Sequence, residues 1–505
     1  MLSKAIRMRL LTLGAMVGLL FIAFVGFGNV SKLFFPYSSM PKFMIDYFAP
    51  EGTRIQDVAR QLQSLEQRLL EDERVEDVAA YIGSGPPRFY LPVEPEELNS
   101  SYGQLIVNVR DFREIKALFQ DLRPWIDENM PEALIPVREY GVGPANTWKF
   151  EIRISGPAEA QPHTLRSLAQ RFVDELESEP MTAYTRTDWR QRVQKLVPVY
   201  NEERGRWAGV TREDIAKATK RAFDGRQVGL YREDDDLIPI LLRHVEEERQ
   251  NVSNVPQLQV LPALATSSVP LSQISDEIAT EWEDPLIRRR DRRRTIAVQA
   301  NPIPGVTLPT LREAVLDKIE AIELPPGYSW TWGGEWESTV DSQSSLIPGI
   351  VPAVVIMLFI LVYLFNAFLP PLIIVATIPF AFIGITAGLL TFNVSFGFMA
   401  LLGTMSLAGM MVKNAIVLLD QADIEVAAGK TRYDAIMNAA ISRLRPVLLA
   451  AATTVLGVVP LIQDVFWIGL AVTIMAGLTF GTILTMIMVP VLYATFYRLK
   501  SPAQA

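Results

Sequence analysis

The longest uncharged stretch of the chain constrains the fold most. Residues 342–412 contain no Asp, Glu, Lys or Arg, and the run is far longer than the ~20 residues that one helix needs to cross a bilayer. A second uncharged run, residues 10–31, has the length of a single crossing. A chain with these two runs is predicted to be a membrane protein that crosses the bilayer several times.

Polar interruptions divide the long run into separate spans. Asn366 with the Pro370-Pro371 pair forms the first break and residues 393–395 form the second. A cleavable signal peptide is the alternative for the first run, but the run exceeds the usual ~7–15 apolar residues and no A-x-A-like site closes it. With a polar loop at 420–445, we expect six membrane helices, near residues 10–31, 347–365, 371–392, 396–419, 446–463 and 468–496.

Charge is distributed unevenly around these spans. Residues 31–346 hold 38 basic and 51 acidic side chains, a net charge of −13, whereas the whole chain carries −8. Basic residues cluster at 4–9, 430–445 and 498–500, which all fall on one side of a six-span protein. The positive-inside rule makes that side cytoplasmic, so we expect the acidic body outside the inner membrane.

The composition also excludes several classes of function. An acidic body disfavours nucleic acid as a partner, because phosphate binding needs a concentrated basic face. The chain has no cysteine and only two histidines, His163 and His244, so disulfides and cysteine nucleophiles are excluded and no metal site is expected. We expect no enzymatic activity, because the sequence has no nucleophile–base set or Gly-rich phosphate loop.

The acidic body contains a pattern that occurs twice. Residues 38–145 follow the order strand, helix, strand, strand, helix, strand, and residues 146–187 with 295–335 repeat it, which predicts two βαββαβ units of the ferredoxin-like type. Residues 188–294 interrupt the second copy and are long enough to be a subdomain, in which Thr211 and Asp214 predict a helix-capping box. The first copy is predicted to have strands at 42–48, 75–82, 104–109 and 134–140 and helices at 55–70 and 113–126.

Residues 288–294, R-R-R-D-R-R-R, form a strongly basic run. One interpretation is a nucleic-acid-binding arm. The other is a solvated or salt-bridging face, which we favour because the run leads directly into a strand of an acidic domain.

Lys413 is the only charged residue between Ser342 and Asp420. It lies roughly 10 Å inside the end of its predicted span at 1.5 Å rise per residue. A lysine at this depth either extends its amine to the interface or is paired with an acid inside a helix bundle. No carboxylate of this chain lies at a comparable depth, so a paired Lys413 requires an acid on another polypeptide.

Other polar or small residues occur in the same spans. Asn414 is adjacent to Lys413 and is able to bond across helices. Thr453 and Thr454 lie in the following span, where a hydroxyl usually bonds back to its own helix. Gly477 and Gly481 form a G-x-x-x-G motif, which favours close helix packing.

Several segments resemble the resistance–nodulation–division (RND) efflux pumps. The segment G-M-M-V-K-N-A-I-V-L-L-D at 409–420, R-L-R-P-V-L-L at 443–449 and T-T-V-L-G-V-V-P-L at 453–461 are similar to the proton-relay spans of that family. The segments 332–336 and 489–493 (V-P-V-L-Y) fit the same pattern. The resemblance covers the whole chain, but only the C-terminal half of such a pump.

The resemblance implies a fold and a proton relay. The fold would be a six-helix membrane block (residues 1–31 and 345–498), two porter subdomains, and a docking subdomain at 188–294. A homologous first half would carry two intramembrane aspartates. Lys413 would pair with these aspartates and release them as they take up protons, and Asn414, Arg443, Thr453 and Thr454 would support the relay. Ala450 stands where the family commonly has threonine, which leaves Thr453 as the candidate replacement.

The resemblance also implies a function. The chain would be a component of a trimeric multidrug efflux pump in the bacterial inner membrane, with a large periplasmic region. It would work by proton antiport, driven by the proton motive force without a cofactor, together with a periplasmic adaptor and an outer-membrane channel. The external units lack methionine pairs suited to soft metal ions, which favours hydrophobic or amphiphilic organic substrates over metal cations.

Candidate substrate-binding residues are Tyr81, Phe89 and Tyr90, the last two within the loop G-S-G-P-P-R-F-Y-L-P. The alternative for this loop is a proline-rich surface excursion. Two other functions stay open. One is a truncated or split fragment that transports nothing alone and acts at most as an assembly subunit. The other is a protein-secretion accessory, whose external regions are smaller.

Overall fold

The structure is a computed structural model that describes residues 2–143, 148–263 and 266–499. The chain forms two compact units. The larger unit combines Met1–Trp189 with Ile287–Ala505, and the smaller unit is Arg190–Leu286. The smaller unit therefore lies within the range 188–294, where the repeat of the βαββαβ pattern is interrupted.

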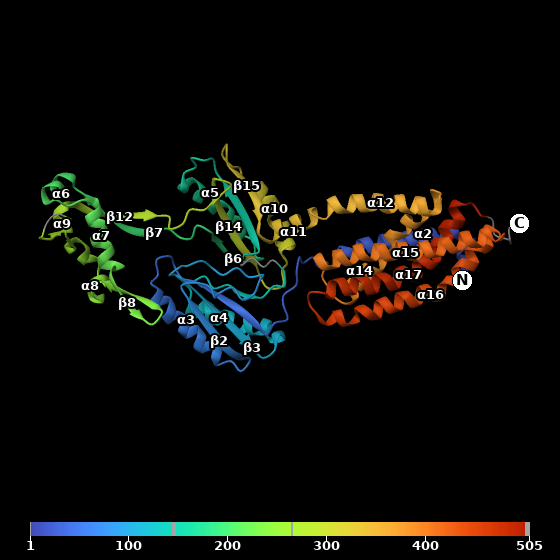
Figure 1. The fold of residues 1–505 in the computed structure, drawn as a ribbon, viewed down its shortest axis with the longest axis horizontal. Coiled ribbons are helices and arrows are strands. Elements are labelled where there is room, and N and C mark those ends of the chain that lie inside the picture. Colours follow the sequence, from blue (N-terminus) through green and yellow to red (C-terminus); the bar gives the residue numbers. More distant parts are fainter. Residues whose placement is uncertain (1, 144–147, 264–265, 500–505) are drawn as a thin grey trace. The chain divides into compact units, whose positions relative to one another are not determined.

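The first sheet of the larger unit has four antiparallel strands and two helices packed on one face. Its strand order is β2-β3-β1-β4, and the core lies between the helices and the sheet. Apolar residues recur at helical spacing along α3, so Val58, Leu62 and Leu65 are all buried. The elements are β1 Lys42–Phe48, α3 Ile55–Leu70, β2 Val75–Ile82, β3 Tyr102–Val109, the 3₁₀ turn η1 Phe112–Glu114, α4 Ile115–Asn129 and β4 Val137–Glu139 (Figure 1).

The second sheet is assembled from segments on both sides of the smaller unit. The long strand β14 pairs with β5, β6 and β13, and β15 pairs with the other edge of β5. Side chains of α5 and α10 complete its core around Phe172 and Val298. The elements are β5 Phe150–Ser155, α5 Pro162–Glu177, β6 Thr182–Thr187, β13 Arg289–Arg290, β14 Arg293–Pro302, α10 Leu308–Glu320 and β15 Ser329–Gly333.

The smaller unit contains short helices and two-stranded sheets. The predicted capping box is confirmed: Thr211 accepts from the backbone N–H of Asp214, and the Asp214 carboxylate accepts from the backbone of Thr211. The elements are β7 Val193–Tyr200, α6 Glu202–Ala208, α7 Arg212–Phe223, β8 Arg226–Glu233, β9 Asp236–Leu242, α8 Glu246–Gln250, η2 Val252–Gln257, β10 Gln259–Val260, β11 Val269–Pro270, α9 Leu271–Ile274 and β12 Ser275–Glu283.

Within the described part of the chain, six helical segments are long and apolar enough to cross a membrane, as predicted. They are Arg9–Phe27 (α2), Gly334–Phe365 (α11 Gly334–Ser344 and α12 Ile347–Phe365), Leu369–Thr391 (α13 Leu369–Thr377, η3 Ile378–Phe380 and α14 Ala381–Thr391), Phe398–Ala427 (α15), Arg432–Gln463 (α16 Arg432–Val458 and η4 Val459–Gln463) and Ile468–Phe496 (α17). A short helix, α1 Leu2–Arg7, precedes the first.

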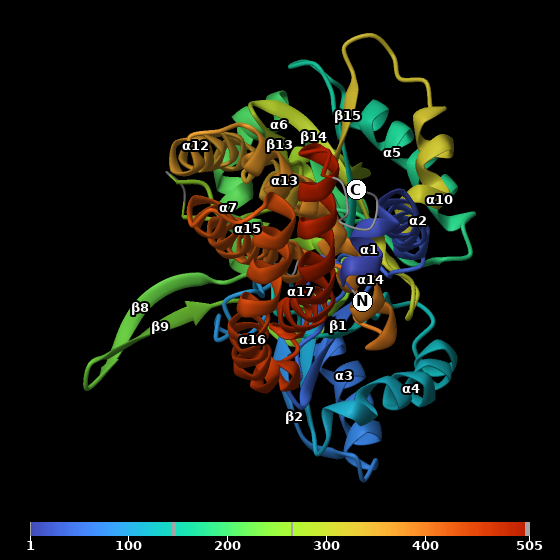
Figure 2. The ribbon, with the colours of Figure 1, turned by 90° about the vertical axis from the view of Figure 1, so that its right-hand side faces the viewer.

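Helix α17 is the centre of the helical block. Figure 2 shows it among α14, α15 and α16, and most of its length is buried, whereas α12 exposes nearly all of its side chains. Small residues make this packing possible. A Cβ at Gly477 would lie 2.2 Å from Leu407 Cδ2, and one at Gly388 would lie 2.3 Å from the Cβ of Ala476. The glycines of the G-x-x-x-G motif are thus used for close helix contact.

The predicted polar loop at 420–445 is wrong. Helix α15 continues to Ala427 and α16 begins at Arg432, so only residues 428–431 connect them. Thr431 caps α16 by accepting from the N–H of Asp434, and Gly429 adopts a left-handed φ of 91°. Charged residues in this range lie on helical extensions beyond the apolar run, which hydropathy alone does not distinguish from a loop.

Some predicted strands are shorter or shifted in the structure. The predicted strand 134–140 contains only β4, Val137–Glu139, with Leu134 in an isolated bridge to Phe48. The predicted helix 113–126 begins with a 3₁₀ turn and continues to Asn129 as α4. Pro136 precedes β4, and its carbonyl accepts from the backbone N–H of Asp46. The chain before β4 therefore already lies along β1, although the regular strand pairing begins only at Val137.

The basic run at 288–294 forms the β13–β14 hairpin, with its turn at Asp291 and Arg292. The structure favours the salt-bridging face over a nucleic-acid arm, because most of its arginines have protein partners. These are Arg288 with Asp188 and Glu97, Arg290 with Glu337, Arg293 with the carbonyls of Gly156 and Gly327, and Arg294 with the carbonyl of Ala160.

Candidate functional site

Lys413 lies near the middle of the 30-residue helix α15. It is 14 residues before the helix end, roughly 20 Å at 1.5 Å rise per residue. The last turns of α15, from Asp420 onward, form the charged extension, so Lys413 lies roughly 10 Å from the end of the apolar run. Its side chain is exposed. Among the residues that the structure describes, it has no hydrogen bond or ion pair.

The exposed face of α15 around Lys413 differs from that of α12. Gly409 and Ser406 lie one and two turns before Lys413 on the same face and are also exposed. The exposed residues of α12 are large and apolar, among them Phe359 and Tyr363. Small and polar residues are typical of contacts between membrane helices, because they let two backbones approach. The Lys413 face is therefore suited to a protein partner.

Asn414 lies about 100° around α15 from Lys413 and is buried. Its amide Nδ2 donates to Thr482 Oγ1 on α17 at 3.5 Å. Thr485, one turn further along α17, donates to the carbonyl of Gly481 at 2.6 Å and lies 3.6 Å from the sulfur of Met411. Asn414 thus belongs to a polar contact between α15 and α17, and Lys413 faces away from it.

Arg443 connects α16 to α15 nearer their joining turn. Its guanidinium donates to Gln421 Oε1 at 2.6 Å, while its Nε is buried without a hydrogen-bond partner. Gln421 is eight residues beyond Lys413 on α15, roughly 12 Å along the helix axis. The structure does not bring Arg443 to Lys413.

Thr453 and Thr454 both donate to the carbonyl of Ala450 at 2.9 Å. Their hydroxyls therefore bond back to their own helix, as a membrane helix commonly arranges them. Because α16 runs back along α15 with Arg443 beside Gln421, Lys413 is level with about residue 451 at equal rise per residue. Residues 450 and 451 are at about the height of the lysine along the helices, and the two threonines lie two to three residues beyond.

The aromatic candidates of the first sheet meet at Tyr140, which follows β4. The ring centroids of Phe89 and Tyr90 lie 6.2 and 5.4 Å from that of Tyr140, and the Tyr90 hydroxyl donates to the carbonyl of Gly141 at 2.9 Å. Tyr81 on β2 lies directly opposite Gln104 on β3, so both side chains are on the same face of the sheet. Phe89 is exposed. The loop after β2 is thus packed on the sheet through its aromatic residues.

A buried carboxylate lies on this face of the sheet. Asp46, 1% exposed, accepts from the Tyr102 hydroxyl at 2.6 Å, from Gln104 Nε2 at 2.7 Å and from Arg138 Nε at 2.5 Å. Burial, followed by the Asp46 charge, raises the pKa of Tyr102 well above its usual value. Burial likewise raises the pKa of Tyr140 to about 12. Both phenols stay protonated at neutral pH. The Tyr102 hydroxyl donates to Asp46, whereas the Tyr140 hydroxyl is buried without a hydrogen-bond partner among the described residues.

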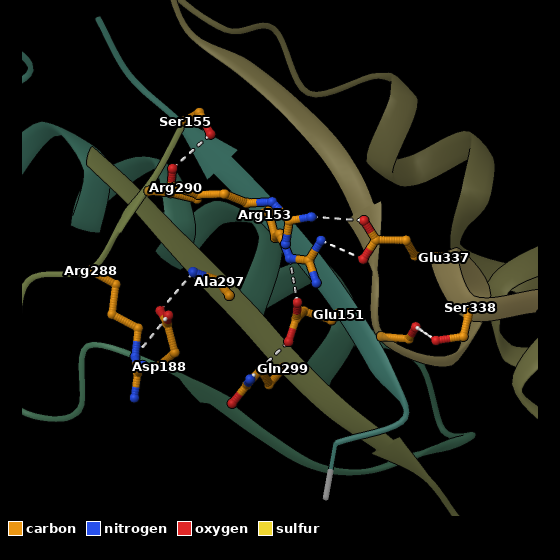
Figure 3. Close-up of polar contacts among 12 residues, drawn as sticks. Glu151, Arg153, Ser155, Asp188, Arg288, Arg290, Ala297, Gln299, Glu337 and Ser338 are labelled. Carbon is orange, nitrogen blue, oxygen red and sulfur yellow. Dashed lines mark hydrogen bonds and ion pairs between the residues drawn. The ribbon is translucent and has the colours of Figure 1, made fainter. Parts of the chain in front are cut away.

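A charged network joins the second sheet to the helix that leads into α12. Arg153 on β5 contacts Glu151 at 2.5 Å and Glu337 of α11 at 2.6 Å (Figure 3). Arg290 on β13 contacts the other oxygen of Glu337 at 2.9 Å. One carboxylate on α11 therefore accepts from two arginines on two strands of the sheet, which fixes the helix against it.

Three contact residues were not predicted from the sequence: Thr482, Gln421 and Tyr140. Each pairs with a candidate residue that is distant in the chain or on another element. Thr482 lies 68 positions from Asn414. The only available signal was its place one residue after Gly481, on the tightly packed face of α17.

The six apolar helical segments and the two helix-covered sheets together have the fold of an RND pump. The AcrB/AcrD/AcrF family profile matches residues 1–497, so the chain belongs to that family of RND permeases. Two crystal structures of a heavy metal efflux pump share its fold. Crystal form II gives a TM-score of 0.80 at 18% identity over 98% of this chain. Crystal form I gives 0.79 at 19% identity over 96%.

The match covers only part of those structures. The chain spans 52% of the pump chain in crystal form II and 50% in crystal form I, about half its length. Efflux is thus the activity of the family to which the chain belongs.

Proposed function

We propose that this chain is an inner-membrane component of a proton-driven RND efflux transporter. It corresponds to the C-terminal half of the pump and works with a homologous first half that carries the intramembrane acids. Each sheet with its two helices is a ferredoxin-like porter subdomain, and the inserted unit is the docking subdomain. The acidic body faces the periplasm, and the pump is a trimer that contacts an adaptor and an outer-membrane channel.

The single observation that carries this proposal is the position of Lys413. An amine near the middle of a membrane helix is costly, by about 2.5–3.5 kcal/mol on insertion scales. No described residue of this chain neutralises it, and the helix face around it carries small residues. A carboxylate on a second polypeptide against that face satisfies both features, and protonation of that carboxylate then releases the lysine.

The other relay candidates have different roles in this proposal. Asn414 holds α15 to α17 through Thr482, and Arg443 holds α16 to α15 through Gln421. Thr453 and Thr454 reach the relay only by giving up their bonds to Ala450. Lys413 is thus the residue whose charge changes partner during the cycle, and the others position its helix.

We further propose that the substrates are hydrophobic or amphiphilic compounds. The support is the aromatic cluster of Phe89, Tyr90 and Tyr140, since aromatic faces bind apolar and cationic amphiphiles. The solved relatives are named for heavy metals, which makes metal export the alternative. Export of an amphiphilic dye and of monovalent and divalent metal ions from cells carrying the complete pump distinguishes the two.

The relay is tested with Lys413→Ala in cells that also contain the first half. We expect dye export to fall to the level of cells without the chain, while the variant folds and reaches the membrane in normal amounts. Lys430→Ala is the matched control, because Lys430 pairs with Glu425 at the α15–α16 turn. Wild-type export by Lys413→Ala would contradict the relay role.

The alternative is a truncated or split fragment that transports nothing alone. The observation that favours it is the unpartnered Lys413 itself, which leaves the relay incomplete in this chain. Export measured with this chain alone, and then with a first half supplied in trans, separates the two proposals. Export restored only in trans supports a split pump, and no export in either case supports a fragment.

A further inference from the structure

The short helix α1 packs against the last turns of α17 (Figure 2). Ile6 of α1 is buried there in one apolar cluster with Val491 and Ala494 of α17. Thr12 of α2 donates from its hydroxyl to the Ala5 carbonyl of α1 at 3.1 Å, which holds the joint between the two helices. Helix α1 is therefore a fixed part of the helical block, and its remaining side chains have defined positions beside the end of α17.

Arg9, the first residue of α2, connects this joint to the end of α17. Its Nη1 donates to the carbonyl of Ala494 at 3.1 Å and to that of Leu499 at 3.2 Å. The N–H of Leu499 donates to the Ala494 carbonyl at 2.9 Å, and Arg498 adopts a left-handed φ of 52°, so α17 ends in a Schellman turn. Arg9 thus fixes Arg498 close to the start of α2.

Three further cations surround this contact without an acidic partner. Lys4 and Arg7 lie three residues apart on α1, and Arg498 follows α17; all three are exposed. Their side chains form no hydrogen bond or ion pair within residues 2–143, 148–263 and 266–499. The first 31 residues contain no Asp or Glu at all. Together with Arg9, these side chains form a patch of four positive charges at one end of the helical block.

Three acidic residues at this end of α15 and α16 have partners of their own. They interact in the pairs Glu425 with Lys430, Asp434 with Thr431 and Asp423 with Arg432. The guanidinium of Arg432 also lies 4.6 Å above the ring of Tyr497. These contacts gather around the α15–α16 turn, so they do not neutralise the patch on α1.

Exposed apolar side chains of α2 begin directly beside the positive patch. Leu10 is 77% exposed and Leu11 is 65% exposed. Val17 and Phe21 are also exposed and follow Leu10 at intervals of seven and four residues, which places the three on one side of the helix. A cationic patch that adjoins an apolar strip matches the two parts of a phospholipid. A free phosphate ion has no group for the second part.

We propose that α1, the start of α2 and the end of α17 form a binding site for an anionic phospholipid. The headgroup phosphate lies among Lys4, Arg7 and Arg498, and an acyl chain follows the exposed side of α2. Basic clusters at the ends of membrane helices bind acidic headgroups through this charge complementarity. The site requires only the membrane helices, so it does not depend on the efflux proposal or on Lys413.

The test measures lipid binding to the full chain in a neutral detergent by native mass spectrometry. Phosphatidylglycerol, which carries one negative charge, is compared with zwitterionic phosphatidylcholine. We expect one phosphatidylglycerol to bind roughly tenfold more tightly than phosphatidylcholine, and inorganic phosphate not to displace it. Equal affinity for the two lipids would overturn the proposal. Displacement by phosphate would also overturn it, because the acyl chain would then contribute nothing.

A double variant locates the site. Lys4→Gln with Arg7→Gln removes two exposed, unpaired cations, so α1 should stay folded, which circular dichroism and thermal unfolding check. We expect the affinity for phosphatidylglycerol to fall roughly 30-fold, since each cation at a membrane surface contributes about fivefold. The affinity for phosphatidylcholine should not change.

The matched control removes the same net charge from lysines that form ion pairs elsewhere. Lys430→Gln with Lys217→Gln is suitable, because Lys430 pairs with Glu425 and Lys217 with Glu213. We expect wild-type binding of phosphatidylglycerol by this control. An equal loss of affinity in the two double variants would show a general effect of net charge and contradict a site at α1.

Discussion

The buried carboxylate of Asp46 is stabilised by three side-chain donors. Asp46 accepts from Tyr102, Gln104 and Arg138, and each of these donors comes from a neighbouring strand. Burial lowers the pKa of Arg138, but the Asp46 charge and hydrogen bond outweigh it, and the net shift is upward. Arg138 therefore stays charged at neutral pH, and its contact with Asp46 stabilises the sheet only while both members are present.

Removing one member of this pair should destabilise the sheet strongly. Asp46→Ala leaves Arg138 buried without its carboxylate, and we expect a loss of about 3–5 kcal/mol in the free energy of unfolding. Thermal unfolding of the full chain in detergent, followed by tryptophan fluorescence, measures it. Asp317→Asn, an exposed carboxylate on α10, is the control, and an equal effect in both variants would refute the argument.

The sequence alone predicts the importance of Lys413 and the kind of partner that it needs. Its isolation in an uncharged run identified it as the site candidate, and the residue type made a carboxylate the expected partner. Its neighbour Asn414 could not be separated from it on this basis. Only helix packing places Asn414 in a buried contact with Thr482 and leaves Lys413 exposed.

At the scale of secondary-structure elements, close contacts between the membrane helices depend on a few small residues. Helix α17 packs against α15 at Gly477, where an added Cβ would lie 2.2 Å from Leu407 Cδ2. Gly457 on α16 has no atom within 4 Å of the position that its Cβ would take. Two glycines of similar appearance in the sequence thus have opposite tolerance to substitution.

This contrast gives a matched prediction. Gly477→Ala should lower the free energy of unfolding by about 1–3 kcal/mol, because the tightly packed helices must separate or Leu407 must shift. Gly457→Ala should have no destabilising effect, and Leu407→Ala combined with Gly477→Ala should recover part of the loss. Thermal unfolding in detergent measures all three, and equal loss in the two glycine variants would contradict the packing argument.

The turn between α15 and α16 shows where element prediction from sequence fails. A stretch of charged residues between apolar runs predicts a loop by hydropathy, yet here the helices continue through it and only residues 428–431 turn. Local signals were present, namely Gly429 and the Thr431 cap. The loop prediction was based on the charged residues instead. Charged residues indicate exposure to water, but they do not indicate whether the backbone is helical.

At the scale of the whole molecule, the Glu337 network is one of the connections between the second sheet and a membrane helix. Arg153 and Arg290 both contact Glu337 on α11, the N-terminal part of the span that includes α12. The network therefore couples the sheet to the helix mechanically.

Glu337→Gln should loosen this connection without unfolding either part. We expect faster hydrogen exchange of the α11 backbone amides, because a neutral amide forms weaker hydrogen bonds with the two arginines than a carboxylate does. Glu313→Gln, on the exposed face of α10, is the control. Unchanged exchange in α11 would show that the network does not hold the helix.

The sequence alone determined the class of this protein. Uncharged runs of bilayer length predict six spans because the hydrocarbon core excludes charge, and this holds whatever the packing. Its motifs also identified the family before any geometry. These properties depend on local composition, and for that reason they are readable from one chain.

The tertiary structure alone decided which side chains meet. Asn414 with Thr482, Arg443 with Gln421 and Asp188 with Arg288 are each far apart in sequence, and their pairing depends on helix rotation and strand register. It also decided that Lys413 is exposed on a face of small residues. Burial and distance are properties of packed elements, so no reading of a single sequence supplies them.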